Sequence, residues 1–288
     1  MSIRIGTCSW TDKTLLSCGR FYPSPKLSAE ERLRFYARRF TTVEVDSSFY
    51  GLPSERNSYL WLSRTPDHFL FNIKAYKTLT LHDRSRGATD QEWAMFRQAL
   101  LPLVSAGRLG YVLFQFPPWF RPGKENLDYL ANCQERLPEM KLAVQFRHAS
   151  WVLGKQEHET FSFLDKQRLA YVSVDEPQIR TAQTMPPLAA ATGSFAVVRF
   201  NGRNVKNWYA KDIPVVERFR YRYQPDELAP WIEKIRSLEQ RTGQVFVMFN
   251  NCFEDDAIVN AIDIARLLGV DLETGGEETP QQQTLFEH

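Results

Sequence analysis

LAVQFRHASW, residues 142–151, opens like a strand buried on both faces and closes with a guanidinium and an imidazole. Such an apolar run is typical of a parallel sheet, whose two faces are both covered. Gln145 and Arg147 are two residues apart, so they share one face of the strand, and Val144 takes the other. The surroundings of these polar side chains at the strand end depend on the fold.

Seven further apolar, β-branched runs occur along the chain, and helical patterns separate most of the eight. They start at Ile3, Thr41, Phe69, Leu109, Ala170, Phe195 and Gln244. Capping boxes at Ser28–Glu31 and Thr89–Glu92 mark the starts of two predicted helices. The weakest helical pattern is in residues 176–194, where Met185-Pro186-Pro187 argues against a long helix.

Alternating strands and helices imply a parallel sheet, and eight repeats predict a closed (β/α)8 TIM barrel. The alternative is an open, doubly wound sheet. Such a sheet usually has a Gly-rich phosphate turn after its first strand, and GTCSW at residues 6–10 is not one. We expect one α/β domain over residues 1–270, followed by a disordered tail over the polar, acidic residues 271–288.

The composition is that of an ordinary globular protein, with 43% hydrophobic and 24% charged residues and a net charge of +2. This charge is too small by itself to indicate a nucleic-acid partner. The four cysteines form no CxxC pair, which predicts reduced thiols in an intracellular protein. The chain shows neither a signal segment nor an apolar run near the ~18 residues of a membrane span. We therefore expect a cytoplasmic protein with no membrane partner.

Polar side chains stand at the ends of most predicted strands. A TIM barrel builds its active site at the carboxyl ends of its strands and in the loops that follow. We therefore expect a ring of polar groups around the mouth of the barrel, formed by Glu44, Asp46, Asn72, Lys74, Gln115, Gln145, Arg147, Asp175, Arg199, Asn201 and Asn250. A charge there is costly unless it is paired or reserved for a ligand. The plainer interpretation is that the charged members neutralise one another in a salt-bridge network.

The leading hypothesis for this ring is a hydrolase-like enzyme or binder for a phosphate-containing or nucleic-acid substrate. Glu44 and Asp175 can serve as acid–base carboxylates, while His148 and His82 can transfer protons. The remaining predicted ligand contacts are the cations Lys74, Arg147, Arg199 and Arg203, together with Gln115, Gln145, Asn201, Asn250 and Trp10. The hypothesis leaves room for one Mg²⁺ or Mn²⁺ on Glu44, Asp46 or Asp175.

Residues 201–224, NGRNVKNWYAKDIPVVERFRYRYQ, interleave basic and aromatic side chains. Basic groups neutralise phosphates and aromatic rings stack on bases, so this composition suits a single-stranded nucleic acid. The alternative is an amphipathic segment whose tyrosines pack against the barrel while its arginines face solvent.

Two other functions are open at this point. The first is a sugar or small-carbonyl enzyme: Trp10 and other aromatic residues near the rim can stack on sugars, with Glu44 and Asp175 as acid and base, or with Lys74 as a Schiff-base nucleophile. A non-catalytic function rests on QQTLF, residues 282–286, which resembles the QxxLF peptide that docks on the bacterial sliding clamp. Gln282, Leu285 and Phe286 would then anchor a DNA-associated adaptor.

The strand ends also carry a resemblance to a known family. The matching motifs are GTCSW at 6–10, FYP at 21–23, VEVDSSFYGLPS at 43–54, FNIKA at 71–75, LFQFPP at 113–118, QFRHASW at 145–151, RFNGR at 199–203 and FNN at 249–251. Together they resemble the YecE-like family, a bacterial and archaeal TIM-barrel domain of unknown function. The resemblance implies the barrel and the position of its site, but no established reaction.

Three positions depart from the pattern of that family, which usually has Glu at position 145, His at 201 and Asn at 46. Gln145 and Asn201 put amides in place of an acid and an imidazole, and amides do not transfer protons. A mechanism that needs a base or a metal ligand at those two positions is therefore not expected in this chain.

Overall fold

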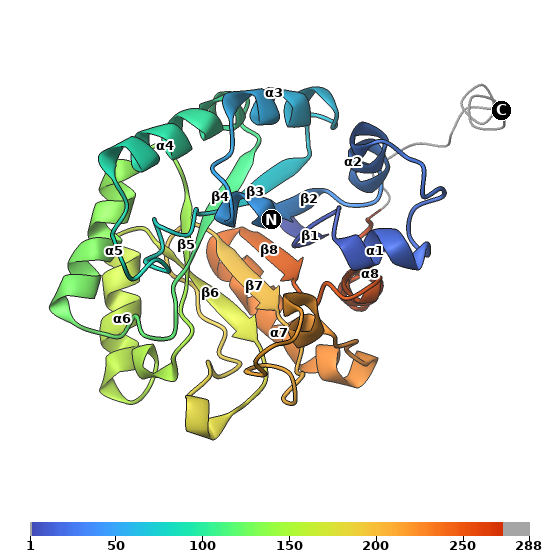
Figure 1. Cartoon of the computed structure of the whole chain (residues 1–288). Coiled ribbons are helices and arrows are strands. Elements are labelled where there is room, and N and C mark those ends of the chain that lie inside the picture. Colours follow the sequence, from blue (N-terminus) through green and yellow to red (C-terminus); the bar gives the residue numbers. More distant parts are fainter. Residues whose placement is uncertain (1, 273–288) are drawn as a thin grey trace.

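A computed structural model describes residues 2–272 of the chain, which form a barrel of parallel strands surrounded by helices (Figure 1). The eight strands are β1 (Ser2–Thr7), β2 (Thr42–Val45), β3 (Leu70–Lys74), β4 (Leu109–Gln115), β5 (Leu142–Gln145), β6 (Ala170–Asp175), β7 (Ala196–Phe200) and β8 (Gln244–Phe249). They are ordered β1-β8-β7-β6-β5-β4-β3-β2, and every hydrogen-bonded pair is parallel. The predicted TIM barrel is confirmed.

The outer layer consists of helices that connect successive strands. They are α1 (Lys13–Cys18), α2 (Ala29–Ala37), α3 (Glu55–Ser63), α4 (Asp90–Ser105), α5 (Lys124–Arg136), α6 (Lys155–Lys166), α7 (Pro225–Thr242) and α8 (Asp256–Leu268). The predicted capping boxes at Ser28 and Thr89 begin α2 and α4. Between β6 and β7 the only helical turn is the short 3-10 segment Arg180–Ala182, in keeping with the prolines of that connection.

Alternation along the strands separates the outer wall from the interior. Val43 and Val45 are buried against the helices, whereas Glu44 points into the barrel and bonds to side chains from other strands. Lower in the interior, the ring of Tyr111 packs edge-on against Phe246, with 5.1 Å between ring centroids, and stacks on Phe195. These rings fill the barrel below the polar groups, as in the packed core of other TIM barrels.

The barrel closes at a seam between β1 and β2, where residues 2–272 contain no hydrogen-bonded ladder. The hydroxyl of Tyr36, on α2, bridges the gap: it accepts from the amide of Thr7 at 2.9 Å and donates to the carbonyl oxygen of Thr42 at 3.3 Å. Gly6 allows this close approach, because a Cβ at that position would overlap the Thr42 carbonyl oxygen.

No helix within residues 2–272 is long and apolar enough to cross a membrane. Residues 273–288 of the predicted tail (271–288), with Gln282, Leu285 and Phe286 of the predicted clamp-binding peptide, lie outside the described residues.

The seam makes a prediction for stability. Gly6→Ala should lower the free energy of unfolding by about 1–3 kcal/mol, because the added methyl group forces β1 away from β2. Gly51→Ala is the matched control, since a Cβ there meets no atom within 4 Å, and it should change stability by less than about 0.5 kcal/mol. Urea unfolding followed by tryptophan fluorescence measures both, and equal midpoints for the two variants would contradict this account of the seam.

Candidate functional site at the carboxyl ends of the strands

The structure brings several of the predicted polar residues together inside the barrel mouth. They come from strands far apart in sequence, because the carboxyl ends of all parallel strands meet at one rim. The shared cluster contains Glu44 from β2, Lys74 from β3, Gln145 from β5, Arg199 from β7, and Asn201 and Asn250 from the residues after β7 and β8.

An ion pair between Arg199 and Glu44 forms the centre of this cluster. Both side chains are fully buried, and two guanidinium nitrogens of Arg199 contact the two carboxylate oxygens of Glu44, with Nε at 3.2 Å from Oε2. The hydroxyl of Tyr111 donates to the same Oε2 at 2.9 Å. Burial opposes ionisation of Glu44, but the Arg199 guanidinium outweighs it and lowers the pKa of the carboxyl. Glu44 is therefore a fixed anion with both oxygens in use.

Amide side chains complete the surroundings of Arg199. Its Nη1 donates to Gln145 Oε1 at 3.0 Å and to Asn201 Oδ1 at 3.4 Å. Asn250 donates to the same Asn201 oxygen at 3.0 Å, so the three amides are fixed in orientation. The Nε2 of Gln145 is buried without a hydrogen-bond partner. A buried donor without a partner costs free energy, so it marks a position where an acceptor would be stabilising.

Asp46 is the carboxylate of the cluster that remains available. Its side chain is 26% exposed, and it lies 3.8 Å from both the Lys74 ammonium and the Arg199 guanidinium. Its Oδ1 has no hydrogen-bond partner. Burial and the neighbouring Glu44 carboxylate raise the pKa of Asp46 to about 6, although Lys74 and Arg199 oppose the shift. A carboxyl with a pKa near 6 can take up and release protons close to neutral pH.

His82, in the loop after β3, lies near the two cations Lys74 and Arg147. Burial and the two cations lower the pKa of His82 to about 4, so the ring is neutral at pH 7. His82 pairs through Nδ1 with the Thr80 hydroxyl at 2.8 Å. Arg147 forms no hydrogen bond or ion pair within residues 2–272; its guanidinium lies 5.8 Å from the ring centroid of Trp208.

Asp175 does not join the cluster, contrary to what the strand pattern predicts. Its Oδ2 accepts from the indole of Trp231, on α7 outside the barrel, at 2.8 Å, and its Oδ1 accepts from the Tyr223 hydroxyl at 2.8 Å. Arg203 pairs with both oxygens, each at 2.8 Å. Asp175 and Arg203 thus fasten α7 to β6, and neither is free for a ligand.

The next residue, Glu176, is the carboxylate that faces the mouth at this strand end. The strand pattern did not predict it. Its Oε1 accepts from the Met185 amide at 2.9 Å, and Asn201 donates to its Oε2 at 3.4 Å. Burial raises the pKa of Glu176, although the nearby Arg147 cation opposes the shift. Alternation puts Glu176 on the same face of the strand as Val172 and Val174, but it does not tell which face is the interior.

His148 also turns away from the mouth. Its Nδ1 accepts from the Ser150 amide at 3.1 Å and caps the 3-10 turn Ala149–Trp151. Burial lowers the pKa of His148, with a smaller contribution from Arg121. This histidine fixes the loop after β5 and does not reach the cluster of Glu44 and Arg199.

Aromatic side chains surround the cluster at the rim. Tyr50 is 68% exposed, and Trp119 and Tyr209 are each 44% exposed. Trp10 is half-buried, packs edge-on against Trp61, and leaves its indole N–H without a partner. Gln115, at the end of β4, is also half-buried and makes no side-chain hydrogen bond within the described chain. The rim therefore offers ring faces and unpaired polar atoms beside two cations.

Part of the basic loop 201–224 is ion-paired or packed within the chain. Arg222 pairs with Asp255 at 2.7 Å and with Asp256 at 2.6 Å, and Arg220 lies 3.6 Å from Glu217. Tyr223 and Trp208 are buried. Of the six basic side chains of this loop, Arg203, Arg220 and Arg222 are ion-paired, whereas Lys206, Lys211 and Arg218 form no ion pair within residues 2–272.

The three carboxylates predicted to hold Mg²⁺ or Mn²⁺ do not form a ligand set. Asp175 faces the outer wall, and both oxygens of Glu44 are taken by Arg199 and Tyr111. Among residues 2–272, no group of three or more His, Cys, Asp or Glu side chains has metal-binding geometry. Glu44, Asp46 and Asp175 therefore provide no shared site for a divalent ion.

The two arginines make opposite predictions for stability. Arg199→Met should lower the free energy of unfolding by about 3–5 kcal/mol, because it leaves Glu44 charged and buried without a partner. Arg147→Met removes no ion pair and should cost less than about 1 kcal/mol. Urea titrations of the two variants test this difference, and a loss of stability in Arg147→Met as large as that in Arg199→Met would contradict it.

The comparisons with known proteins agree with this architecture. The model of a family described as protein of unknown function DUF72 matches residues 4–284. The UPF0759 protein YunF of Bacillus subtilis (strain 168) is 35% identical over 290 residues, covering 99% of this chain and 100% of YunF. The UPF0759 protein YecE of Escherichia coli (strain K12) is 27% identical over 186 residues, covering 59% of this chain and 66% of YecE.

Two crystal structures of DUF72 family proteins superpose over nearly the whole barrel. The one from Enterococcus faecalis V583 has a TM-score of 0.84 at 26% identity and covers 96% of this chain and 100% of its own. The one from Thermotoga maritima MSB8 has a TM-score of 0.81 at 30% identity and covers 93% of this chain and 100% of its own. The chain therefore belongs to the DUF72 family, the YecE-like proteins that its strand-end motifs resemble.

Proposed function

We propose that the chain is a hydrolase that acts on a small phosphate-bearing ligand at the mouth of the barrel. The observation that carries this proposal is the unpaired guanidinium of Arg147. An arginine beside a half-buried site with no carboxylate partner is suited to bind an anion, because guanidinium groups form paired, charge-assisted hydrogen bonds with phosphate.

The neighbours of Arg147 support an anionic ligand rather than a cation. Lys74 is the second cation, and both are near enough to His82 to depress the pKa of its ring. An N–H donor without a partner, Gln145 Nε2, belongs to the same cluster as Lys74. A phosphate group supplies the acceptor oxygens that such donors lack.

The size of the ligand follows from which cations are free. Arg203, Arg220 and Arg222, in the loop 201–224, are ion-paired with carboxylates of the chain. An extended single strand would need several unpaired cations along its path. Three basic side chains of the loop remain without an ion pair among the described residues, fewer than an extended strand would use, so we favour a small phosphate ester, with the exposed rings of Tyr50, Trp119 and Tyr209 to stack on its organic part.

Asp46 would act as the general base. Ionised above about pH 6, its partly exposed carboxylate accepts a proton from a water molecule that attacks phosphorus. The ester P–O bond breaks as the new P–O bond forms, and the proton on Asp46 is then available to the leaving oxygen. Lys74 keeps Asp46 ionised, and Glu44 holds Arg199 in place without exchanging protons itself.

Anion binding is tested first with inorganic pyrophosphate at low ionic strength, by isothermal titration calorimetry. We expect Arg147→Met to weaken binding by about tenfold or more, the loss of one charge-assisted contact worth 1.5–3 kcal/mol. The exposed Arg241→Met on α7 is the matched control and should bind like the wild-type chain. The proposed anion site would be refuted if the wild-type protein does not bind pyrophosphate, or if Arg147→Met binds it equally well.

The role of Asp46 is tested with p-nitrophenyl phosphate and bis(p-nitrophenyl) phosphate. Because a base must be ionised, turnover should rise as the pH increases through about 6. Asp46→Asn should lower kcat by on the order of 10²–10⁴-fold. The same variant should bind pyrophosphate at least as well as wild type, since a negative charge beside Lys74 is removed. Intact esters after incubation with the wild-type chain would exclude hydrolysis while leaving the anion site standing.

A further inference from the structure

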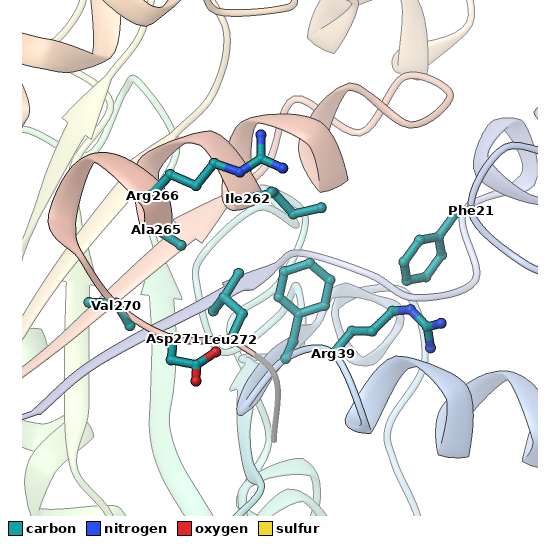
Figure 2. Close-up of a pocket in the computed structure, with 9 residues that line it drawn as sticks. Phe21, Arg39, Ile262, Ala265, Arg266, Val270, Asp271 and Leu272 are labelled. Carbon is teal, nitrogen blue, oxygen red and sulfur yellow. The ribbon is translucent and has the colours of Figure 1, made fainter. Parts of the chain in front are cut away.

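A hollow of about 420 Å³ lies on the outer wall of the barrel, between α8 and the end of α2 (Figure 2). Its lining is mostly apolar and consists of Phe21, Phe40, Ile262, Ala265, Val270 and Leu272, with Arg39, Arg266 and Asp271 as the charged members. Phe40 comes just before β2 and Ala265 is near the end of α8, so the hollow lies toward the amino ends of the strands. It is thus separate from the site at the mouth.

The described part of the chain ends in this hollow, because Leu272 is both its last residue and part of the lining. The sixteen residues that follow, 273–288, contain four glutamates and no lysine or arginine. Leu285 and Phe286 are the only large apolar side chains among them, and they are adjacent. A segment with one apolar pair in a polar, acidic sequence is typical of a peptide that docks through that pair.

We propose that Leu285 and Phe286 dock in this hollow of their own chain. Twelve residues, 273–284, connect them to Leu272, and a random coil of that length spans on the order of 20 Å, enough to fold back onto the lining. Gly275-Gly276 allows the reversal. Because the tether is short, the effective concentration of the pair at the hollow is on the order of millimolar, so a weak contact suffices.

Size and charge both favour this occupant. The hollow is within the range of volumes that hold small apolar groups, about 300–1,000 Å³. Arg266 has a largely exposed side chain at the rim, 3.7 Å from Asp263, and Arg39, in the turn after α2, lies across from it (Figure 2). The acidic residues 273–288 carry the opposite sign to these two arginines, which steers the segment toward the hollow.

Docking would cover the same two side chains that anchor the predicted sliding-clamp peptide. The intramolecular contact needs only the apolar pair, whereas the clamp peptide also uses Gln282. This difference separates the two interactions experimentally. The inference does not depend on the hydrolase proposed above.

The test is hydrogen–deuterium exchange, read by mass spectrometry on the full-length chain. Amides of residues 283–288 and 262–272 should exchange about tenfold more slowly in the wild type than in the double variant Leu285→Ala/Phe286→Ala. Gln282→Ala is the matched control and should exchange like the wild type. Ile262→Lys, which places a charge in the hollow, should release residues 283–288 as the double variant does, with an unchanged Tm as the check on folding.

Measuring the exchange at two protein concentrations tells whether the docked segment comes from the same chain or from a second copy. Protection that is unchanged over a tenfold dilution is expected for docking within one chain, and protection lost on dilution would assign the contact to a second copy and overturn the inference. Residues 283–288 that exchange equally fast in the wild type and the double variant would overturn it as well. So would a loss of protection in Gln282→Ala equal to that in the double variant.

Discussion

The buried pair between Arg199 and Glu44 is the constraint on which the mouth of the barrel depends. Two opposite charges in a dry interior are stabilising only when their remaining hydrogen-bonding atoms also find partners. Tyr111, Gln145 and Asn201 provide these partners, and each comes from a different strand or strand end. The pair therefore fixes the relative positions of β2, β4, β5 and β7 at the level where the site begins. Asp46 and Asn250 are in turn positioned against it.

The fold could be predicted from the sequence because its signals are local and repeated. Buried parallel strands are read as short apolar runs, and the capping boxes at Ser28 and Thr89 mark helix starts without reference to tertiary structure. Two consecutive prolines also indicated that no long helix connects β6 and β7. The seam between β1 and β2 was not, because Tyr36 closes it from another element and no pattern within either strand reveals this.

The site was only partly predictable, since position along a strand does not specify direction. Asp175 and Glu176 are adjacent acids at one strand end, and only the contacts of Asp175 with Trp231 and Arg203 reveal which of the two faces outward. Similarly, Arg147 and Arg199 have the same strand-end setting in the sequence, yet one is paired and the other is not. Whether an arginine forms an ion pair depends on residues of other strands, so the sequence of its own strand does not reveal it.

The departures from the usual family pattern have a common position in space. Gln145 and Asp46 both neighbour the Arg199 guanidinium, at 3.0 and 3.8 Å. An acid is absent at the first position and present at the second, so the number of carboxylates around Arg199 is preserved while their location changes. The ionisable carboxyl thus lies beside Lys74, at Asp46, and position 145 carries an amide.

The pairing of β1 with β8 has a consequence for biosynthesis. Ser2 is in register with Gln244, so the first strand to leave the ribosome has its ladder partner more than 240 residues later in the chain. During translation, β2 to β7 can assemble in order, while β1 lacks its ladder partner and is linked to β2 through the Tyr36 hydroxyl. An unpaired edge is a template for wrong partners. The nascent chain therefore needs protection at its amino end until β8 emerges, and a ribosome stalled before residue 244 leaves an open, aggregation-prone sheet.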